Sequence, residues 1–257
     1  MSIDRREEAA VRRWQPGQRW YHPLIAAAVI NLSKLVMRGM NTLAIEGSER
    51  FQTLQQRGGR GLLTFGNHVS LFDDPLLVSN FGLGRYRDVR WVAADALNFF
   101  GSPFKAWLFT AGKSVPIVRG AGIEQPGLRF LRERLEEGAW VHVFPEGGRT
   151  RDRRALMTHP FKAGIGRLMA EARPLALPFY HYGMHAVLPV GAKLPRRGKT
   201  VRLVFGETID CDEPWVREAG RGEEGPRLWE ALAERAYEAL RELELGVNPN
   251  AGTESGR

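Results

Sequence analysis

The stretch WVHVFPEG, residues 140–147, indicates the fold class, because a short apolar run rich in β-branched and aromatic residues ends abruptly at Pro-Glu-Gly. A run of this kind, followed by residues that break regular structure, is typical of a buried strand. Runs of the same character follow or precede it along the chain, at 61–66, 89–94, 114–119, 175–182 and 201–206. The sequence therefore predicts six buried strands.

Helical patterns separate several of these runs. Residues 125–137, 161–172 and 226–245 place leucines and other apolar residues at helical spacing among charged ones. Strands that alternate with helices favour a mainly parallel sheet covered on both faces. We predict an α/β fold, a single domain with a mainly parallel or mixed sheet flanked by helices.

Two apolar segments have alternative interpretations. Residues 20–40 predict a helix with aromatic residues at its start and Lys34 and Arg38 near its end, which suits either a helix in a lipid headgroup layer or one packed on the core. Residues 97–109 hold five aromatic residues, which suit insertion in a bilayer, an acyl tunnel or a helix covering the sheet. We divide the chain into an N-terminal segment with an amphipathic or interfacial helix (1–45), a main α/β domain (46–246) and a disordered polar tail (247–257).

Composition excludes several classes of protein. The chain has 257 residues, of which 43% are hydrophobic and 26% charged, as in ordinary globular proteins. The single cysteine, Cys211, excludes an internal disulfide and a multi-cysteine zinc site. No apolar run reaches the roughly twenty residues that a spanning helix needs, and the N-terminus lacks the pattern of a signal peptide.

The net charge of +8 predicts attraction to anionic surfaces, either nucleic acid or acidic lipid. No helix-turn-helix, RNP or zinc-finger spacing supports nucleic acid, so we expect none as a partner. We predict instead a peripheral protein at an anionic membrane surface, on the cytoplasmic side. The sequence carries no signal for an oligomeric state.

Polar residues follow the predicted strands where chemistry gathers in open α/β sheets, at the carboxyl ends. His68 follows the strand 61–66, and Asp73 or Asp74 meets its ring only if a turn intervenes. A carboxylate on one ring nitrogen leaves the other nitrogen as a general base. The plainer alternatives are a hydrogen-bonded loop histidine and, for Asp74 before Pro75, a helix cap.

Two other chemistries are disfavoured. Ser70 lacks the Gly-x-Ser-x-Gly elbow of a nucleophilic serine. A mixed metal site from histidines and aspartates has no recognisable ligand spacing, so we predict no metal.

Four segments in a fixed order resemble the motifs of the glycerolipid acyltransferases, which move a fatty acyl group onto a hydroxyl of glycerol or a lysophospholipid. They are Asn67-His68-x4-Asp73, Pro116-Ile117-Val118-Arg119, Phe144-Pro145-Glu146-Gly147-Gly148-Arg149-Thr150 and Leu177-Pro178-Phe179. Within this superfamily the chain looks most like the tafazzins, transacylases that exchange acyl chains between phospholipid and lysophospholipid. The resemblance spans 67–189; Gly112 agrees with the tafazzins, whereas Arg149 and Thr150 agree with the general acyltransferases.

The resemblance implies roles for the matched residues. His68 would be the general base and Asp73 its orienting partner, with direct attack and no acyl-enzyme. The guanidinium groups of Arg119 and Arg149 would hold the phosphate of the acceptor. Glu146 would order that pocket. Gly147 would belong to the substrate-binding residues, because a glycine there lets the backbone approach the ligand closely. The supporting residues are Gly148, which would allow the same close approach, and three side chains without an assigned chemistry, Asn67, Thr150 and His181.

We therefore expect an enzyme, a membrane-associated acyltransferase that acylates a lysophospholipid by tafazzin-like transacylation. The alternative is a 1-acylglycerol-3-phosphate acyltransferase that uses acyl-CoA or acyl carrier protein, and the non-enzyme alternative is an inactive module that binds anionic lipid. The resemblance implies no cofactor, apart from acyl-CoA or acyl carrier protein as a donor substrate.

Overall fold

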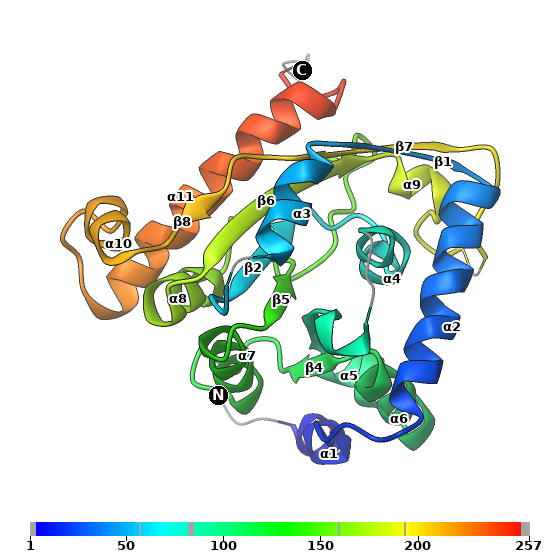
Figure 1. The fold of residues 1–257 in the computed structure, drawn as a ribbon, viewed down its shortest axis with the longest axis horizontal. Helices are drawn as coiled ribbons and strands as arrows, with labels where there is room; N and C mark the ends of the chain where they lie inside the picture. Colours follow the sequence, from blue (N-terminus) through cyan, green and yellow to red (C-terminus); the bar gives the residue numbers. More distant parts are fainter. Residues whose placement is uncertain (1–3, 57, 82–84, 159, 193, 253–257) are drawn as a thin grey trace.

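The computed structural model describes residues 4–56, 58–81, 85–158, 160–192 and 194–252. Its centre is an eight-stranded mixed sheet in the order β1-β7-β6-β2-β5-β3-β4, with β8 paired to β6 (Figure 1). The strands are β1 (Thr42–Glu46), β2 (Leu62–Gly66), β3 (Trp91–Asp95), β4 (Ser114–Ile117), β5 (Trp140–Val143), β6 (Leu175–Tyr182), β7 (Thr200–Phe205) and β8 (Ile209–Asp210).

The neighbouring pairs among β6, β2, β5, β3 and β4 are parallel, so their carboxyl ends lie along one edge of the sheet. Strand β7 runs antiparallel to β6 and parallel to β1. The predicted α/β class and single mixed sheet are confirmed, and all six predicted strands are present with ends shifted by at most two residues.

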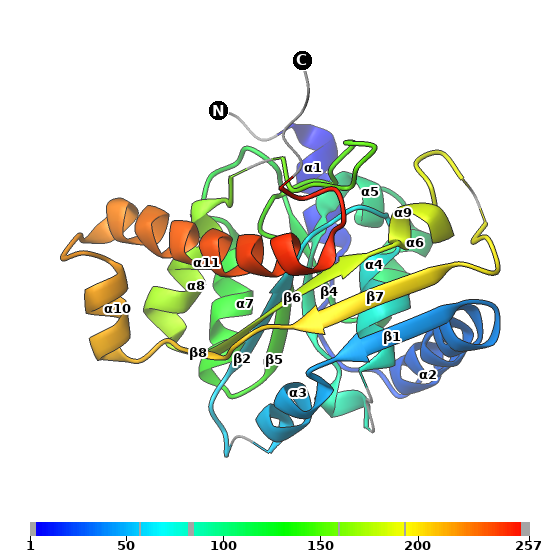
Figure 2. The ribbon, with the colours of Figure 1, turned by 90° about the horizontal axis from the view of Figure 1, so that it is seen from above.

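Helices cover both faces of this sheet, as Figure 2 shows from above. The α-helices are α1 (Arg5–Arg13), α2 (His22–Lys34), α3 (Ser48–Gln55), α4 (Asp73–Leu77), α5 (Ala96–Phe100), α6 (Pro103–Ala111), α7 (Pro126–Glu136), α8 (Ala163–Ala172), α9 (Met184–Val187), α10 (Glu213–Ala219) and α11 (Gly225–Val247). A π-helical segment, Leu35–Gly39, continues α2.

Two hydrophobic clusters divide the core because successive strand residues point to opposite faces. Leu63 and Phe65 of β2 belong to the cluster beneath α7, α8 and α11. Leu62, one residue away, belongs to the cluster that includes Phe51 of α3 and Leu77 of α4. Strand β2 is buried along its whole length, which explains its uninterrupted apolar sequence.

The segment predicted as an interfacial helix packs on the domain with one face and exposes the other. Ser33 is buried and its hydroxyl donates to the carbonyl of Leu76 at 2.9 Å, whereas Leu24 and Leu32 are more than half exposed. The aromatic segment 97–109 divides similarly: Phe100 is buried, and Phe104 is 68% exposed. No helix in the described part of the chain has the length and apolar content needed to cross a bilayer.

The sequence prediction missed strands β1 and β8 and helices α1, α3, α9 and α10. Strand β1 is a half-exposed edge strand and β8 has two residues, so neither leaves a strong apolar run. Helix α1 is predominantly charged and begins with a capping box between Asp4 and Glu7.

The prediction of a disordered tail is wrong for residues 248–252. Asn248 is buried, and its side-chain amide donates to the carbonyls of Arg154 and Ala155 at 3.0 and 3.2 Å. Polar composition gives no sign of these contacts, because their acceptors lie far away in sequence. Residues 253–257 of the predicted tail lie outside the described residues.

Candidate active site

A histidine and a buried aspartate meet where β2 ends. His68 Nδ1 lies 2.9 Å from Asp73 Oδ2. Asp73 is fully buried, whereas the His68 side chain keeps 15% of its surface exposed. The turn between them also places the backbone N–H groups of Val69 and Ser70 2.8 Å from the same carboxylate oxygen. The turn expected from the five-residue spacing is therefore present.

The surroundings of Asp73 favour its anionic form. Burial alone raises the pKa of Asp73, but the facing rings of His181 and His68 outweigh burial and hold the pKa well below its usual range. With Asp73 ionised, His68 carries its hydrogen on Nδ1 and donates it to the carboxylate. His68 Nε2 has no hydrogen-bond partner among the described residues, and the ring is partly open to solvent.

The aspartate that serves the histidine is thus Asp73, and the expectation that Asp74 caps a helix is wrong. Asp74 lies in the first turn of α4 and forms a bidentate ion pair with Arg90, whose Nε is 2.8 Å from Asp74 Oδ1. Arg90 also donates to the carbonyl of Gly112 at 3.0 Å. An arginine sixteen residues downstream competes for the carboxylate, which local sequence signals do not reveal.

Asn67 joins the end of β2 to the end of β6. Its side-chain amide donates to the carbonyl of His181 at 3.0 Å and accepts from the N–H of His181 at 2.9 Å. His181 Nε2 lies 3.1 Å from the Asn67 carbonyl and 3.6 Å from Asp73 Oδ2. The asparagine side chain therefore prolongs the pairing of two parallel strands beyond the point where β2 ends.

The loop after β5 supports the histidine from another side. Glu146 Oε1 accepts the N–H of His68 at 3.2 Å, and the N–H of Thr150 donates to the carbonyl of His68 at 2.8 Å. The ring of Phe144 stacks on the His68 ring with centroids 4.1 Å apart. Burial raises the pKa of Glu146 to about 7, and its Oε2 is buried without a hydrogen-bond partner among the described residues. Glu146 therefore holds the backbone at His68 and is poised between its neutral and anionic forms.

The two predicted phosphate-binding arginines follow β4 and β5, at the same carboxyl edge as His68. Arg119 is 58% exposed, and its Nε forms an ion pair with Asp95 at 2.9 Å. Two strands lie between β4 and β2, which puts the strands about 14 Å apart. Arg149 is partly exposed and has no ion pair with another described residue.

The predicted glycines differ from each other. Gly147 adopts a left-handed conformation with φ of 70°, which explains glycine at this turn. A Cβ added at Gly148 would meet no atom of the described residues within 4 Å, so the space around this glycine is open. The structure thus brings together Asn67, His68, Asp73, Glu146, Thr150 and His181. Among the described residues, the predicted arginines and glycines, Arg119, Arg149, Gly147 and Gly148, form no hydrogen bond to this group.

The disfavoured chemistries remain without support from geometry. Ser70 is 1% exposed, and its hydroxyl donates to the carbonyl of Leu188 at 3.3 Å. Among the described residues, no group of three or more His, Cys, Asp or Glu side chains is arranged to hold a metal ion.

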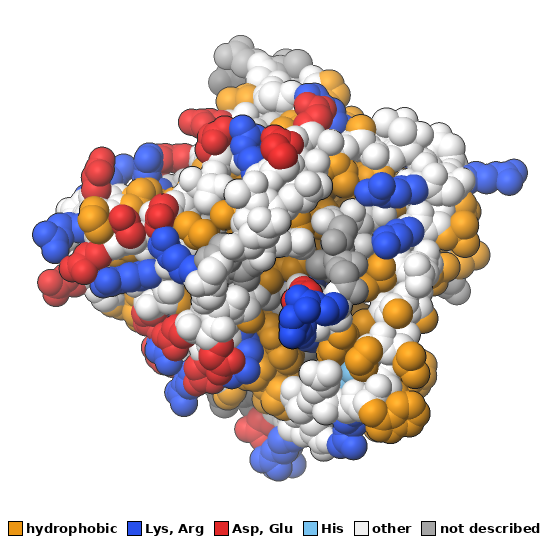
Figure 3. Space-filling model, viewed as in Figure 1, with side chains coloured by type: hydrophobic (Ala, Val, Ile, Leu, Met, Phe, Trp, Pro, Cys, Tyr) orange, Lys and Arg blue, Asp and Glu red, His pale blue; other side chains and the backbone are white. Residues whose placement is uncertain are grey.

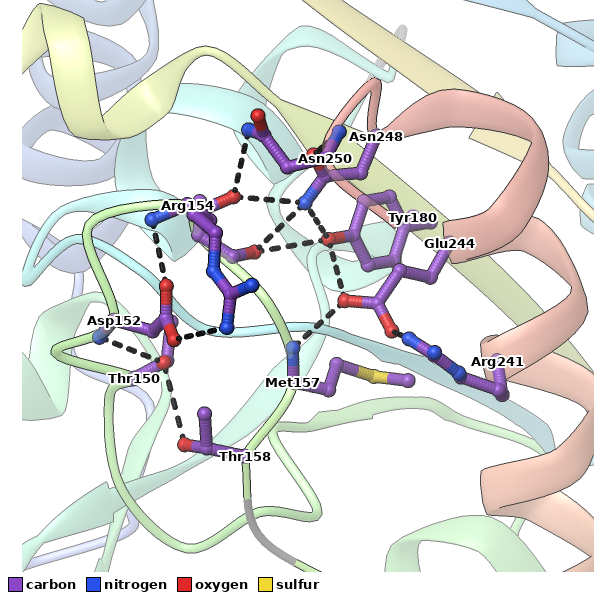
Figure 4. A network of polar contacts seen from close by, with 11 residues as sticks. Thr150, Asp152, Arg154, Met157, Thr158, Tyr180, Arg241, Glu244, Asn248 and Asn250 are labelled. Atoms are coloured by element: carbon purple, nitrogen blue, oxygen red, sulfur yellow. Dashed lines mark hydrogen bonds and ion pairs between the residues drawn. The ribbon is translucent and has the colours of Figure 1, made fainter. Parts of the chain in front are cut away.

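Sequence reasoning missed a buried polar network beside the site, shown in Figure 4. Glu244 of α11 is fully buried; its Oε1 accepts from the N–H of Met157 at 2.7 Å and the hydroxyl of Tyr180 at 3.1 Å, and its Oε2 pairs with Arg241. Asn248 donates to the Tyr180 hydroxyl at 3.1 Å. The available signal was the position of Glu244 on the apolar face of the predicted helix. The many other charged residues of α11 obscure this signal in the sequence.

The fold and this arrangement define the class: the chain belongs to the acyltransferase family, whose family model matches residues 42–188. Three curated relatives are similar over most of the chain. Tafazzin of Drosophila melanogaster is 32% identical, and the match covers 89% of this chain and 62% of the relative. Taffazin of Dictyostelium discoideum is 36% identical, and the match covers 68% of this chain and 65% of the relative. The N-acylphosphatidylethanolamine synthase of Arabidopsis thaliana is 31% identical over 76% of this chain and 72% of the relative.

The resemblance to the tafazzins is therefore confirmed, although the matched region spans less than two thirds of those two proteins. A solved structure shares the fold: the 1-acyl-sn-glycerophosphate (LPA) acyltransferase PlsC from Thermotoga maritima superposes with a TM-score of 0.56. The superposition covers 87% of this chain and 82% of the PlsC chain, and the two sequences are 21% identical.

Proposed function

We propose that this protein is an acyltransferase at a membrane surface that moves a fatty acyl chain onto the hydroxyl of a lysophospholipid. The observation that carries the proposal is the His68–Asp73 contact of 2.9 Å, with the carboxylate fully buried and the ring partly open. The similarity to two tafazzins and to an N-acylphosphatidylethanolamine synthase supports lipid acyl chains as the group transferred.

The chemistry follows from the tautomer of His68. Its Nε2 accepts the proton of the acceptor hydroxyl while the hydroxyl oxygen forms a bond to the acyl carbonyl carbon. When the tetrahedral intermediate collapses, the bond to the leaving oxygen of the donor phospholipid breaks, and His68 returns the proton to that oxygen. Asp73 keeps the ring in the required orientation and stabilises the transient imidazolium.

The rim of the site suits an anionic headgroup. Arg119 and Arg149 both follow strands that end at this edge, and both keep surface exposed to solvent. Their guanidinium groups can bind a phosphate with two hydrogen bonds each, which would hold the acceptor hydroxyl beside His68. Asp95, itself mostly buried, fixes the position of Arg119 by its ion pair.

An apolar surface beside the site suits attachment to a bilayer. Trp20, Leu24 and Leu32 lie on or next to α2 and are 61–84% exposed. Phe104 and Trp107 on the contacting helix α6 are also exposed. In Figure 3, hydrophobic side chains gather along the right side of the molecule, over α2. Together with the net charge of +8, this surface supports peripheral binding to a membrane that contains anionic lipid.

The test uses vesicles that contain phospholipid with a labelled acyl chain, together with lysophospholipid and no CoA. The native protein should move the label to the acceptor, and His68→Ala should lower the rate by roughly a hundred- to ten-thousand-fold through loss of the base. Ser70→Ala should keep most of the activity, because the Ser70 hydroxyl contacts only a backbone carbonyl in the described structure.

Other outcomes separate the alternatives. Label transfer that requires acyl-CoA or acyl carrier protein would assign a thioester donor instead of a phospholipid. Full activity of His68→Ala would refute the general-base mechanism, and loss of activity in Ser70→Ala would indicate an acyl-enzyme. Vesicle binding without any transfer would leave a lipid-binding module as the function.

A further inference from the structure

His181 occupies a place behind the dyad that general-base catalysis by itself does not require. It lies near the end of β6, is fully buried, and directs Nε2 toward Asp73 Oδ2 from 3.6 Å. Asp73 therefore lies between two imidazole rings, because His68 Nδ1 contacts the same oxygen at 2.9 Å.

The contacts of His181 fix its tautomer. The acceptors facing Nε2 are the Asn67 carbonyl at 3.1 Å and the Asp73 carboxylate, so the hydrogen is on Nε2. Its Nδ1 is buried without a hydrogen-bond partner among the described residues. What distinguishes this histidine is that its Nε2 faces the carboxylate that orients His68.

Two routes connect His181 to His68. The direct route is electrostatic, since the N–H dipole of His181 stabilises the Asp73 anion that orients His68. The second route is through Asn67, whose amide exchanges two hydrogen bonds with the His181 backbone and which immediately precedes His68 in the chain. Both routes converge on the turn that carries the base.

We propose that His181 is a positioning residue for the dyad: its Nε2–H holds the Asp73 carboxylate and the Asn67 carbonyl in place, and thereby sets the orientation and basicity of His68. This inference rests on the proposed function. The Nε2–H dipole beside Asp73 draws electron density away from the Asp73–His68 hydrogen bond. Without that dipole, the Asp73 carboxylate holds the hydrogen of the His68 ring more tightly.

The test compares His181→Asn with His181→Gln. A glutamine amide reaches the position of Nε2 and restores the donor, whereas an asparagine amide reaches only the position of Nδ1, away from Asp73. We expect His181→Asn to lower kcat roughly ten- to a hundred-fold, as small misplacements of catalytic groups do. The KM for lysophospholipid should change little, and the acid limb of the pH–rate profile should move to higher pH. His181→Gln should recover most of the rate and the native limb.

The control is His142→Asn. His142 is also fully buried, in β5, but its Nδ1 bonds to Thr64, so the variant should alter stability without moving the acid limb. Of the other titratable groups near the dyad, Glu146 and His185 are unchanged in all variants, and His142, whose ring contacts Phe144, is changed only in the control. A native limb and native kcat in His181→Asn, or equal losses in the asparagine and glutamine variants, would overturn the proposal. An inactive native protein would instead refute the proposed function itself.

Discussion

Asp73 after β2 and Glu244 in α11 are both fully buried carboxylates, and they are held in different ways. Both oxygens of Glu244 have partners: a backbone N–H, a tyrosine hydroxyl and an arginine. Asp73 receives its donors on Oδ2 alone, and Oδ1 has no partner among the described residues. One of those donors is a ring whose other nitrogen is open. A carboxylate whose two oxygens both have partners, such as Glu244, is suited to a structural role. Asp73 instead orients a histidine ring whose free nitrogen can exchange a proton with a substrate.

The most direct challenge to this contrast is Asp73→Asn. The amide keeps the shape but no longer fixes the His68 hydrogen on Nδ1, so we expect a fall in kcat of about ten-thousand-fold, by analogy with triads that lose their carboxylate. The measurement is single-turnover acyl transfer, with thermal melting to confirm folding. A folded Asp73→Asn protein within tenfold of the native rate would show that the carboxylate does not orient the base.

Removing the other carboxylate should change stability instead. Glu244→Leu leaves the buried Met157 N–H without its acceptor and Arg241 without its ion-pair partner, and we expect a loss of about 3 kcal/mol in the free energy of unfolding. Urea denaturation measures it. The turnover of the molecules that remain folded should lie within several-fold of the native value.

The matched control is Glu242→Leu, an exposed position two residues earlier on the same helix, which should change stability by less than about 0.5 kcal/mol. Equal effects of the two substitutions would show that the network around Glu244 contributes nothing to stability.

Glu146 is a third buried carboxylate, and its effect on stability as pH changes can be compared with the effects of Asp73 and Glu244. Burial raises its pKa from 4.5 to about 7, so between these values the folded protein binds more protons than the unfolded chain. Stability from this group is therefore fully present below pH 4.5 and is lost as pH rises from there through about 7. The full effect corresponds to about 3 kcal/mol, and part of it falls between pH 5 and 8.

Urea unfolding of native protein and Glu146→Gln at several pH values isolates this contribution, because the glutamine stays neutral throughout. Stability relative to the native protein should improve in Glu146→Gln as pH rises. His142 contributes a slope of opposite sign in both proteins, because burial lowers its pKa to about 4. Glu230→Gln, at an exposed position, should leave the native slope unchanged; parallel slopes for native protein and Glu146→Gln would contradict the prediction.

How far the sequence predicts the site depends on the range of the contacts. The pair His68 and Asp73 is five residues apart, and a turn between them follows from the residues present. The partner of Arg119 was missed, since Asp95 meets it only because β3 and β4 are paired. Arg90 was missed for the same reason: it lies sixteen residues after Asp74 and pairs with that carboxylate, which distinguishes Asp74 from Asp73. The network of Glu244 joins segments 64 to 87 residues apart, and no local pattern marks it.

Local sequence accounts for the six buried strands, the helices between them and the order of the motifs at the strand ends. Apolar periodicity, turn residues and a short chain separation are local properties. The packing of the whole chain, in contrast, places His181 behind Asp73, makes Asn67 a link between two strands, and buries part of the polar tail. These outcomes depend on which strands become neighbours and on which donors then compete for each buried acceptor, and residues far apart in sequence settle both.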